Sequence, residues 1–189
     1  MKLSYELIVT DKEGKVIDRR DGESRSWLIA WLLLVYGCFR FVDQTITCTD
    51  GVARLNDQGY NTLASRAVAG DATRGSVVGS GTMAVALSDH ALETQIAHGV
   101  GAGQLQYGAT SFVYPPAILA KQCYFKMGRT FTNGSGGDVS VNEFGVYTDI
   151  GLGTFEACVC RDVLLNPVVV PDGAALTLRY RFRAEHTLP

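Results

Sequence analysis

The sequence predicts a mainly β fold, an antiparallel β-sandwich or jelly-roll-like domain, with one apolar α-helix in its N-terminal region. Short stretches of alternating polar and apolar residues recur along the chain, and turn sequences such as GSGG at 134–137 and PDG at 171–173 separate them. Long helical stretches do not alternate with these strands, which argues against a parallel α/β sheet. We therefore expect a single β-rich domain over residues 1–189.

The first 50 residues are expected to form a hairpin followed by the helix. Residues 3–19 alternate around a charged turn, and Ser24 or Ser26 can cap a helix that Gly37 ends. Nearly every residue between the cap and this glycine is apolar, so the helix has no clear polar face.

Two interpretations of this apolar helix stay open. It is covered on all sides by its own sheet, or one side packs on the sheet while the other meets a partner chain. In the second case residues 1–50 form an interface appendage, and Trp27, Trp31 and Leu34 are the candidate interface residues.

The rest of the chain is predicted to consist of strands joined by loops. Residues 43–51 are typical of a short strand and turn, and residues 51–75 of a long loop. Residues 76–116 predict a strand, a turn, a helix of one or two turns around 91–96, a glycine-rich loop and another strand. The last third of the chain predicts three further strands.

Residues 119–147 predict a long hairpin with GSGG at its tip, because the segments on both sides alternate. The apolar residues before and after Asn142 and Glu143 have opposite parity, which predicts a β-bulge at these two residues. Glu143 is therefore expected either in water at a sheet edge or beside a cation.

The first candidate for that cation is Arg161, which shares parity with Phe155, Ala157 and Val159 on an otherwise apolar strand face. Arg129, on the far side of the predicted hairpin, is the second candidate. A Glu143–Arg161 pair would hold the bulge in place, which is a structural role and not a catalytic one.

No motif in the sequence carries convincing catalytic chemistry. The glycine-rich segments 75–81 and 99–104 lack the Gly-Lys-Ser/Thr ending of a phosphate-binding loop, so we interpret their glycines as turn residues. One cluster of titratable residues resembles a site, but its spacing fits no familiar ligand pair, and a polar surface is favoured over metal binding or catalysis. This cluster consists of Asp89, His90, Glu93 and His98.

The five cysteines are predicted to be reduced thiols and not a disulfide framework, because their number is odd and their spacing irregular. Cys158 and Cys160 are expected on one face of a strand, where they are more typical of small buried apolar residues than of zinc ligands. We expect no cofactor and no metal.

Charge and hydropathy exclude other classes of partner. Hydrophobic residues make up 47% of the chain and charged residues 19%, which argues against disorder. The net charge is −2 and the 17 basic residues are scattered, so no nucleic-acid partner is expected. The most apolar run, residues 27–39, has roughly half the length of a membrane span and follows charged residues, so neither a membrane segment nor a secretory signal is expected.

Several segments together resemble a family of small structural proteins encoded by tailed bacteriophages and prophages. The likeness covers most of the chain and rests on SRSW with its apolar helix, GSVVGSGTMAVALSDHALETQIAHG, GQLQYG, RTFTNGSGGDVSVNEFGVY and CRDVLLNPVVVPDGAALTLRYRF. It implies a virion component of the capsid, neck, tail or baseplate, made in the bacterial cytoplasm, that works as a homo-oligomer beside other virion proteins. Five cysteines are many for such a protein.

The expected function is therefore a non-enzymatic, self-assembling virion protein. The alternative is a receptor- or carbohydrate-binding module at a tail tip, with an exposed aromatic pocket near Tyr107, Phe112 and Tyr114. An enzyme ranks third and would have to use the cluster at 89–98.

Overall fold

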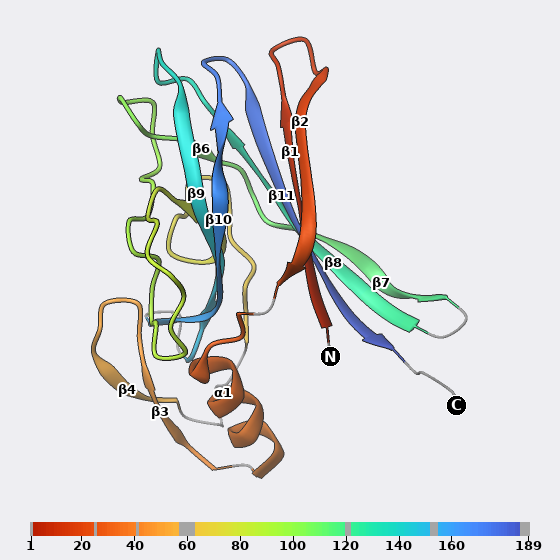
Figure 1. Ribbon diagram of the computed structural model, residues 1–189. Helices are drawn as coiled ribbons and strands as arrows, with labels where there is room; N and C mark the ends of the chain where they lie inside the picture. The colour runs from red at the N-terminus through yellow and green to blue at the C-terminus, as the bar shows by residue number, and fades with distance from the viewer. Residues whose placement is uncertain are drawn as a thin grey trace.

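The computed structural model describes residues 2–24, 26–40, 42–56, 63–119, 122–151 and 155–185. It confirms a mainly β fold with antiparallel sheets and one helix, arranged in the manner of a β-sandwich (Figure 1). One hydrophobic cluster contains residues from both large sheets and from the helix, so these elements share a core.

The larger sheet has the strand order β2-β1-β11-β8-β6, and β7 pairs with β8 beside β6. Its strands are β1 (Lys2–Thr10), β2 (Val16–Ser24), β6 (Gln106–Tyr107), β7 (Ser111–Leu119), β8 (Gln122–Thr132) and β11 (Ala175–Glu185). Alternate residues of β11 face the core, because Leu176, Leu178 and Tyr180 are buried while Thr177 and Arg179 between them lie on the other face. The predicted first hairpin is present as β1 and β2.

The smaller sheet has the order β10-β9-β5. Its strands are β5 (Gly75–Gly79), β9 (Val139–Asp149) and β10 (Glu156–Val170). One of its faces packs on the larger sheet, since the ring of Phe144 in β9 lies 4.8 Å from that of Tyr5 and 6.0 Å from that of Tyr180. Its other face is covered by the irregular segment that follows β5, where the Leu92 N–H donates to the Tyr147 hydroxyl at 2.8 Å.

The predicted hairpin over 119–147 is wrong, because its two strands belong to different sheets. β8 pairs with β11, β6 and β7, whereas β9 pairs with β10 and β5. The GSGG turn therefore carries the chain from one sheet to the other. Asn133 fixes the crossing, because its Nδ2 donates to the carbonyls of Gly137 at 2.8 Å and Val170 at 2.7 Å. Two alternating strands around a glycine turn look the same in sequence whether they pair or not.

The helix α1 (Ile29–Arg40) begins after the first hairpin and lies at one end of the smaller sheet (Figure 1). Neither predicted cap residue caps it, because Ser24 ends β2 and the helix begins only at Ile29. Ser26 lies in the chain just before the helix, which runs along the edge of β10, where the Leu28 N–H donates to the Val159 carbonyl at 3.0 Å. The helix continues three residues beyond Gly37, the predicted end. Among the described residues, no helix is long and apolar enough to cross a membrane.

Three further segments differ in part from expectation. The last third of the chain, expected as three strands, forms two, because residues 156–170 belong to the single strand β10 and β11 follows it. The predicted strand after α1 is present in a separate small hairpin of β3 (Gln44–Thr47) and β4 (Ala53–Asn56). The short helix predicted around 91–96 is not formed, and this stretch is irregular chain pinned to β5 by the Ile96 N–H, which donates to the Val78 carbonyl at 2.9 Å.

Candidate functional site

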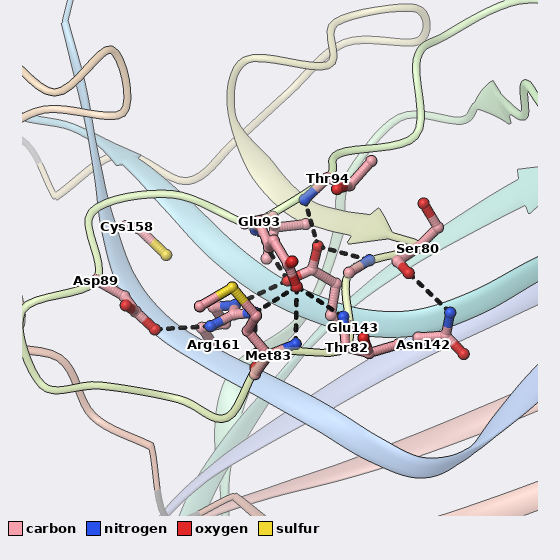
Figure 2. A network of polar contacts seen from close by, with 12 residues as sticks. Ser80, Thr82, Met83, Asp89, Glu93, Thr94, Asn142, Glu143, Cys158 and Arg161 are labelled. Carbon is pink, nitrogen blue, oxygen red and sulfur yellow. Dashed lines mark hydrogen bonds and ion pairs between the residues drawn. The ribbon is translucent and has the colours of Figure 1, made fainter.

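A buried network of polar side chains lies where residues 80–96, the covering segment that follows β5, pack on the smaller sheet (Figure 2). At its centre Arg161 of β10 donates through Nε to Glu143 Oε2 of β9 at 2.7 Å. The two side chains are 3% and 0% exposed. The structure therefore brings together the first-choice pair expected from the sequence, and a charge pair buried to this extent needs further hydrogen bonds to be stable.

A bulge in β10 positions Arg161 for this contact. Cys158 lies opposite Tyr147 and Cys160 opposite the adjacent Val146, so Val159 is an additional residue. The bulge reverses the parity of the strand, and the expectation that Cys158 and Cys160 share a face is wrong. For the same reason Arg161 faces the covering segment together with Cys158, and not the side predicted from simple alternation.

The predicted irregularity at Asn142 and Glu143 is present in the ladder, but its additional residues belong to the partner strand. Glu143 lies opposite Val163 and Val141 opposite Val168, so residues 164–167 of β10 face Asn142 alone. Asn142 turns away from the ladder and donates through Nδ2 to the Ser80 carbonyl at 2.8 Å.

The Glu143 carboxylate also accepts three backbone hydrogen bonds. The N–H groups of Gly81 and Thr94 donate to Oε1 at 3.1 and 2.8 Å, and that of Glu93 donates to Oε2 at 3.1 Å. The covering segment can approach so closely because two glycines lie beside the carboxylate, Gly79 at the end of β5 and Gly81 in the segment. A Cβ on Gly79 or Gly81 would lie 2.6 or 2.5 Å from Oε1. These glycines therefore make room for a carboxylate, a role that their sequence context does not reveal.

Arg161 has additional partners in the covering segment. Its Nη1 donates to Asp89 Oδ2 at 2.7 Å, and its Nη2 donates to the Met83 carbonyl at 3.1 Å and lies 3.8 Å from Glu93 Oε2. Burial alone would lower the pKa of Arg161, but the hydrogen bonds and charges of Glu143 and Asp89 outweigh it and raise that pKa. The guanidinium therefore stays charged.

The cluster at residues 89–98, predicted from the sequence, does not form one site, because its members contact different parts of the structure. Asp89 and Glu93 bind Arg161, and Glu93 Oε2 also accepts the N–H groups of Thr82 and Met83, both at 2.7 Å. His98, in contrast, accepts the Tyr107 N–H through Nδ1 at 3.0 Å. Within the described ranges, no group of three or more His, Cys, Asp or Glu side chains is placed to hold a metal ion.

The second-choice partner, Arg129, lies in the other sheet and is held differently. Its Nε donates to the Gly108 carbonyl at 2.7 Å, and its Nη1 to those of Arg74 and Ser76 at 2.8 and 3.1 Å. Its Nη2 donates to the carbonyls of Val68 and Asp71. Burial lowers the pKa of Arg129. In the part of the chain that the structure describes, no ion pair joins it to a carboxylate.

The candidate interface residues of the helix region pack mainly within the chain. Leu34 is fully buried, and the half-buried rings of Trp27 and Trp31 stack on each other at 4.5 Å. Among the described side chains of α1, the large apolar residues that are exposed are instead Ile29 and Leu32, at 53% and 66%, together with Tyr36 at 49%. A helix with apolar residues on all sides gives no periodicity from which its exposed side could be predicted.

An apolar pocket of about 240 Å³ opens between α1 and the diverging ends of the two sheets. Four aromatic side chains line it: Trp31, Phe112, Phe125 and Phe182. Phe112 was expected in an exposed aromatic pocket, but Tyr107 is buried in the core, and the side chain of Tyr114 lies outside the described residues.

Comparisons with known proteins give no identification. No family model matches the chain, and no curated protein or solved structure is significantly similar to it.

Proposed function

We propose that this chain is a non-enzymatic structural protein that self-assembles through the exposed apolar face of α1. Ile29, Leu32 and Tyr36 follow a spacing of three and four residues, which places them on one side of the helix. Leu87, which is 74% exposed, continues this face, because its carbonyl accepts the Ile29 N–H at 3.1 Å. Contiguous exposed apolar residues of this kind mark interaction surfaces.

The polar network supports the non-enzymatic part of this proposal. Each oxygen of Glu143 accepts two hydrogen bonds, and all three guanidinium nitrogens of Arg161 have acceptors. Because all the hydrogen-bonding atoms of this pair have partners, the pair holds the covering segment on the sheet and has no unbonded polar atom to offer a substrate. The tailed-phage particle, as capsid decoration, neck, tail or baseplate, is the assembly that the sequence resemblance suggests.

Native mass spectrometry over a range of concentrations tests the proposal, with Leu32→Asp as the disruptive variant. Leu165→Asp is the matched control, because Leu165 is a leucine of β10 that is 97% exposed and does not belong to α1. We expect the unaltered protein and the control to form the same oligomer and Leu32→Asp to remain a folded monomer. A monomeric unaltered protein, or an oligomer that tolerates Leu32→Asp, contradicts self-assembly through this face.

The second candidate function is a receptor- or carbohydrate-binding module, which the aromatic pocket favours. Sugars stack on aromatic rings, but they also need hydrogen-bonding groups, and the polar lining residues are Ser65 and Thr148. The buried Thr148 hydroxyl has no hydrogen-bond partner in the described ranges. Ligand-observed NMR with oligosaccharides tests this function. Binding that Phe112→Ala removes supports it, and no binding contradicts it.

A further inference from the structure

The outer face of the larger sheet carries two cations directly opposite each other. Arg181 of β11 and Lys126 of β8 are cross-strand partners, and both lie on the face that points away from the smaller sheet. Like charges at directly opposite positions of antiparallel strands destabilise a sheet. An arrangement that destabilises the free protein indicates a ligand of opposite charge.

The neighbouring cations have acidic partners among the described residues, and these two do not. Arg19 and Arg179 both pair with Glu6, at 2.5 and 3.1 Å, and Arg183 lies 3.7 Å from Glu23. For Lys126 and Arg181, no carboxylate of the described residues lies within salt-bridge distance. Glu6 and Glu23 are therefore already paired with other arginines, and Asp21, the third acid on this face, lies within salt-bridge distance of neither Lys126 nor Arg181.

An aromatic ring holds the unpaired arginine in place. The Arg181 guanidinium carbon lies 4.4 Å from the centre of the Tyr124 ring, and Lys126 Nζ lies 5.9 Å from the same centre. Stacking on the ring limits the freedom of the guanidinium, so less entropy is lost when a ligand binds.

Beside these residues the surface is hollowed into a pocket of about 390 Å³. Four cationic and two acidic side chains line it, namely Arg19, Lys126, Arg179, Arg181, Glu6 and Asp21. The lining has a net positive charge of two. A pocket with excess positive charge concentrates anions from solution.

We propose that this pocket, the Lys126–Arg181 pocket, binds a phosphate or sulfate group. An ammonium and a guanidinium on adjacent strands approach a ligand from two sides, and a tetrahedral oxyanion has acceptor oxygens in both directions. A planar carboxylate fits a single guanidinium better than this pair. The site lies on a different face from α1 and does not depend on self-assembly.

Isothermal titration with inorganic pyrophosphate, and separately with sulfate, tests the site and distinguishes the two anions. Lys126→Glu is the test variant, and Lys12→Glu is the control with the same change of net charge. Lys12 lies in the turn of the first hairpin, with 77% of its side chain exposed. We expect Lys126→Glu to weaken binding by at least about tenfold, because it replaces a charge-assisted donor by an anion. Lys12→Glu should bind like the unaltered protein.

The thermal stability of the same variants, without added anion, gives a second measurement. Lys126→Glu places a carboxylate opposite Arg181 and should raise the melting temperature, because repulsion becomes attraction. Absence of binding by the unaltered protein overturns the proposal, as does equal weakening by both variants, which would indicate non-specific attraction. A lower melting temperature for Lys126→Glu would show that Lys126 stabilises the fold, and would also overturn it.

Discussion

The two buried arginines, Arg161 and Arg129, are satisfied in different ways on the two sheets. Arg161 binds Glu143 and Asp89, so its charge is neutralised by carboxylates, and its pKa is raised. Arg129 binds five backbone carbonyls, and its guanidinium carbon lies 4.8 Å from the centre of the Tyr107 ring, while burial lowers its pKa. The Arg161 site is stabilised by opposite charges. The Arg129 site is stabilised by the number and geometry of the hydrogen bonds that its guanidinium donates.

This difference determines which substitutions each site tolerates. In the Arg161 network the carboxylate also serves the backbone, since Glu143 accepts three N–H groups of the covering segment. Replacing both Glu143 and Arg161 by apolar residues would therefore leave these donors without an acceptor. The expectation from isolated buried pairs, that a double apolar replacement is milder than a single one, does not apply to this pair.

The largest effect is expected for Glu143→Leu, which removes the centre of the charged site. The variant removes one of the two acids that lie 2.7 Å from Arg161 and leaves three N–H groups without an acceptor, and we expect the free energy of unfolding to fall by about 3 to 5 kcal/mol. Urea denaturation followed by circular dichroism measures it. Glu13→Leu, in the exposed turn of the first hairpin, is the control and should change stability by less than about 0.5 kcal/mol. A loss for Glu143→Leu as small as that of the control would contradict the account.

Lysine substitutions separate charge from geometry. Arg129→Lys keeps the charge but cannot serve five carbonyls, so we expect a loss of about 2 to 3 kcal/mol. Arg161→Lys keeps the attraction to the carboxylates and should cost about 1 to 2 kcal/mol. The same urea titrations give both values. If Arg161→Lys proves the more damaging of the two, the proposed difference between the sites is wrong.

The close approach of the covering segment to Glu143 is tested by adding one methyl group. Gly81→Ala would place its Cβ 2.5 Å from Glu143 Oε1, and we expect a loss of about 1 to 3 kcal/mol from overpacking. Gly137→Ala is the matched control, because its Cβ meets no atom within 4 Å. That variant should be neutral or more stable by up to about 1 kcal/mol. Equal melting temperatures for the two variants would show that Gly81 is not a close-approach position.

The smallest effect is expected for Tyr107→Phe beside Arg129. The variant keeps the ring and loses the hydroxyl that donates to the Ile96 carbonyl at 2.6 Å, at a cost of about 1 kcal/mol. Burial raises the pKa of Tyr107 to about 12 from a usual value of 10.0. Its stabilising contribution is complete below pH 10 and is lost as the pH rises toward 12, since ionisation then favours the unfolded chain. Stability measured from pH 9 to 11 should fall less steeply in Tyr107→Phe, and identical slopes would exclude this contribution.

The Glu143–Arg161 pair could be predicted because a buried acid and a buried base each require a partner. The parity that placed Arg161 on the same face as Ala157 was wrong, because the bulge at Val159 changes the face on which Arg161 lies. Bulges leave little trace in a sequence when both faces of a strand are covered. The pairing of β8 and β9 was predicted wrongly for a related reason, because alternation identifies strands but not their neighbours.

The site of Arg129 could not be predicted. Its partners are carbonyls of Val68, Asp71, Arg74, Ser76 and Gly108. Every residue has a carbonyl, so no residue type indicates such a partner in advance. Gly79 and Gly81 were likewise interpreted as turn residues. Nothing in the sequence distinguishes a glycine that makes room for a distant carboxylate from a glycine that forms a turn.

The central claim is that the Glu143 carboxylate holds the covering segment on the smaller sheet, and amide hydrogen exchange tests it most directly. Glu93 and Thr94 are exposed residues whose N–H groups donate to Glu143. Slow exchange at these two amides therefore depends on that carboxylate. We predict that both are protected in the unaltered protein and exchange rapidly in Glu143→Leu, while the core amides of β11 stay slow. Rapid exchange of both amides in the unaltered protein would contradict the claim.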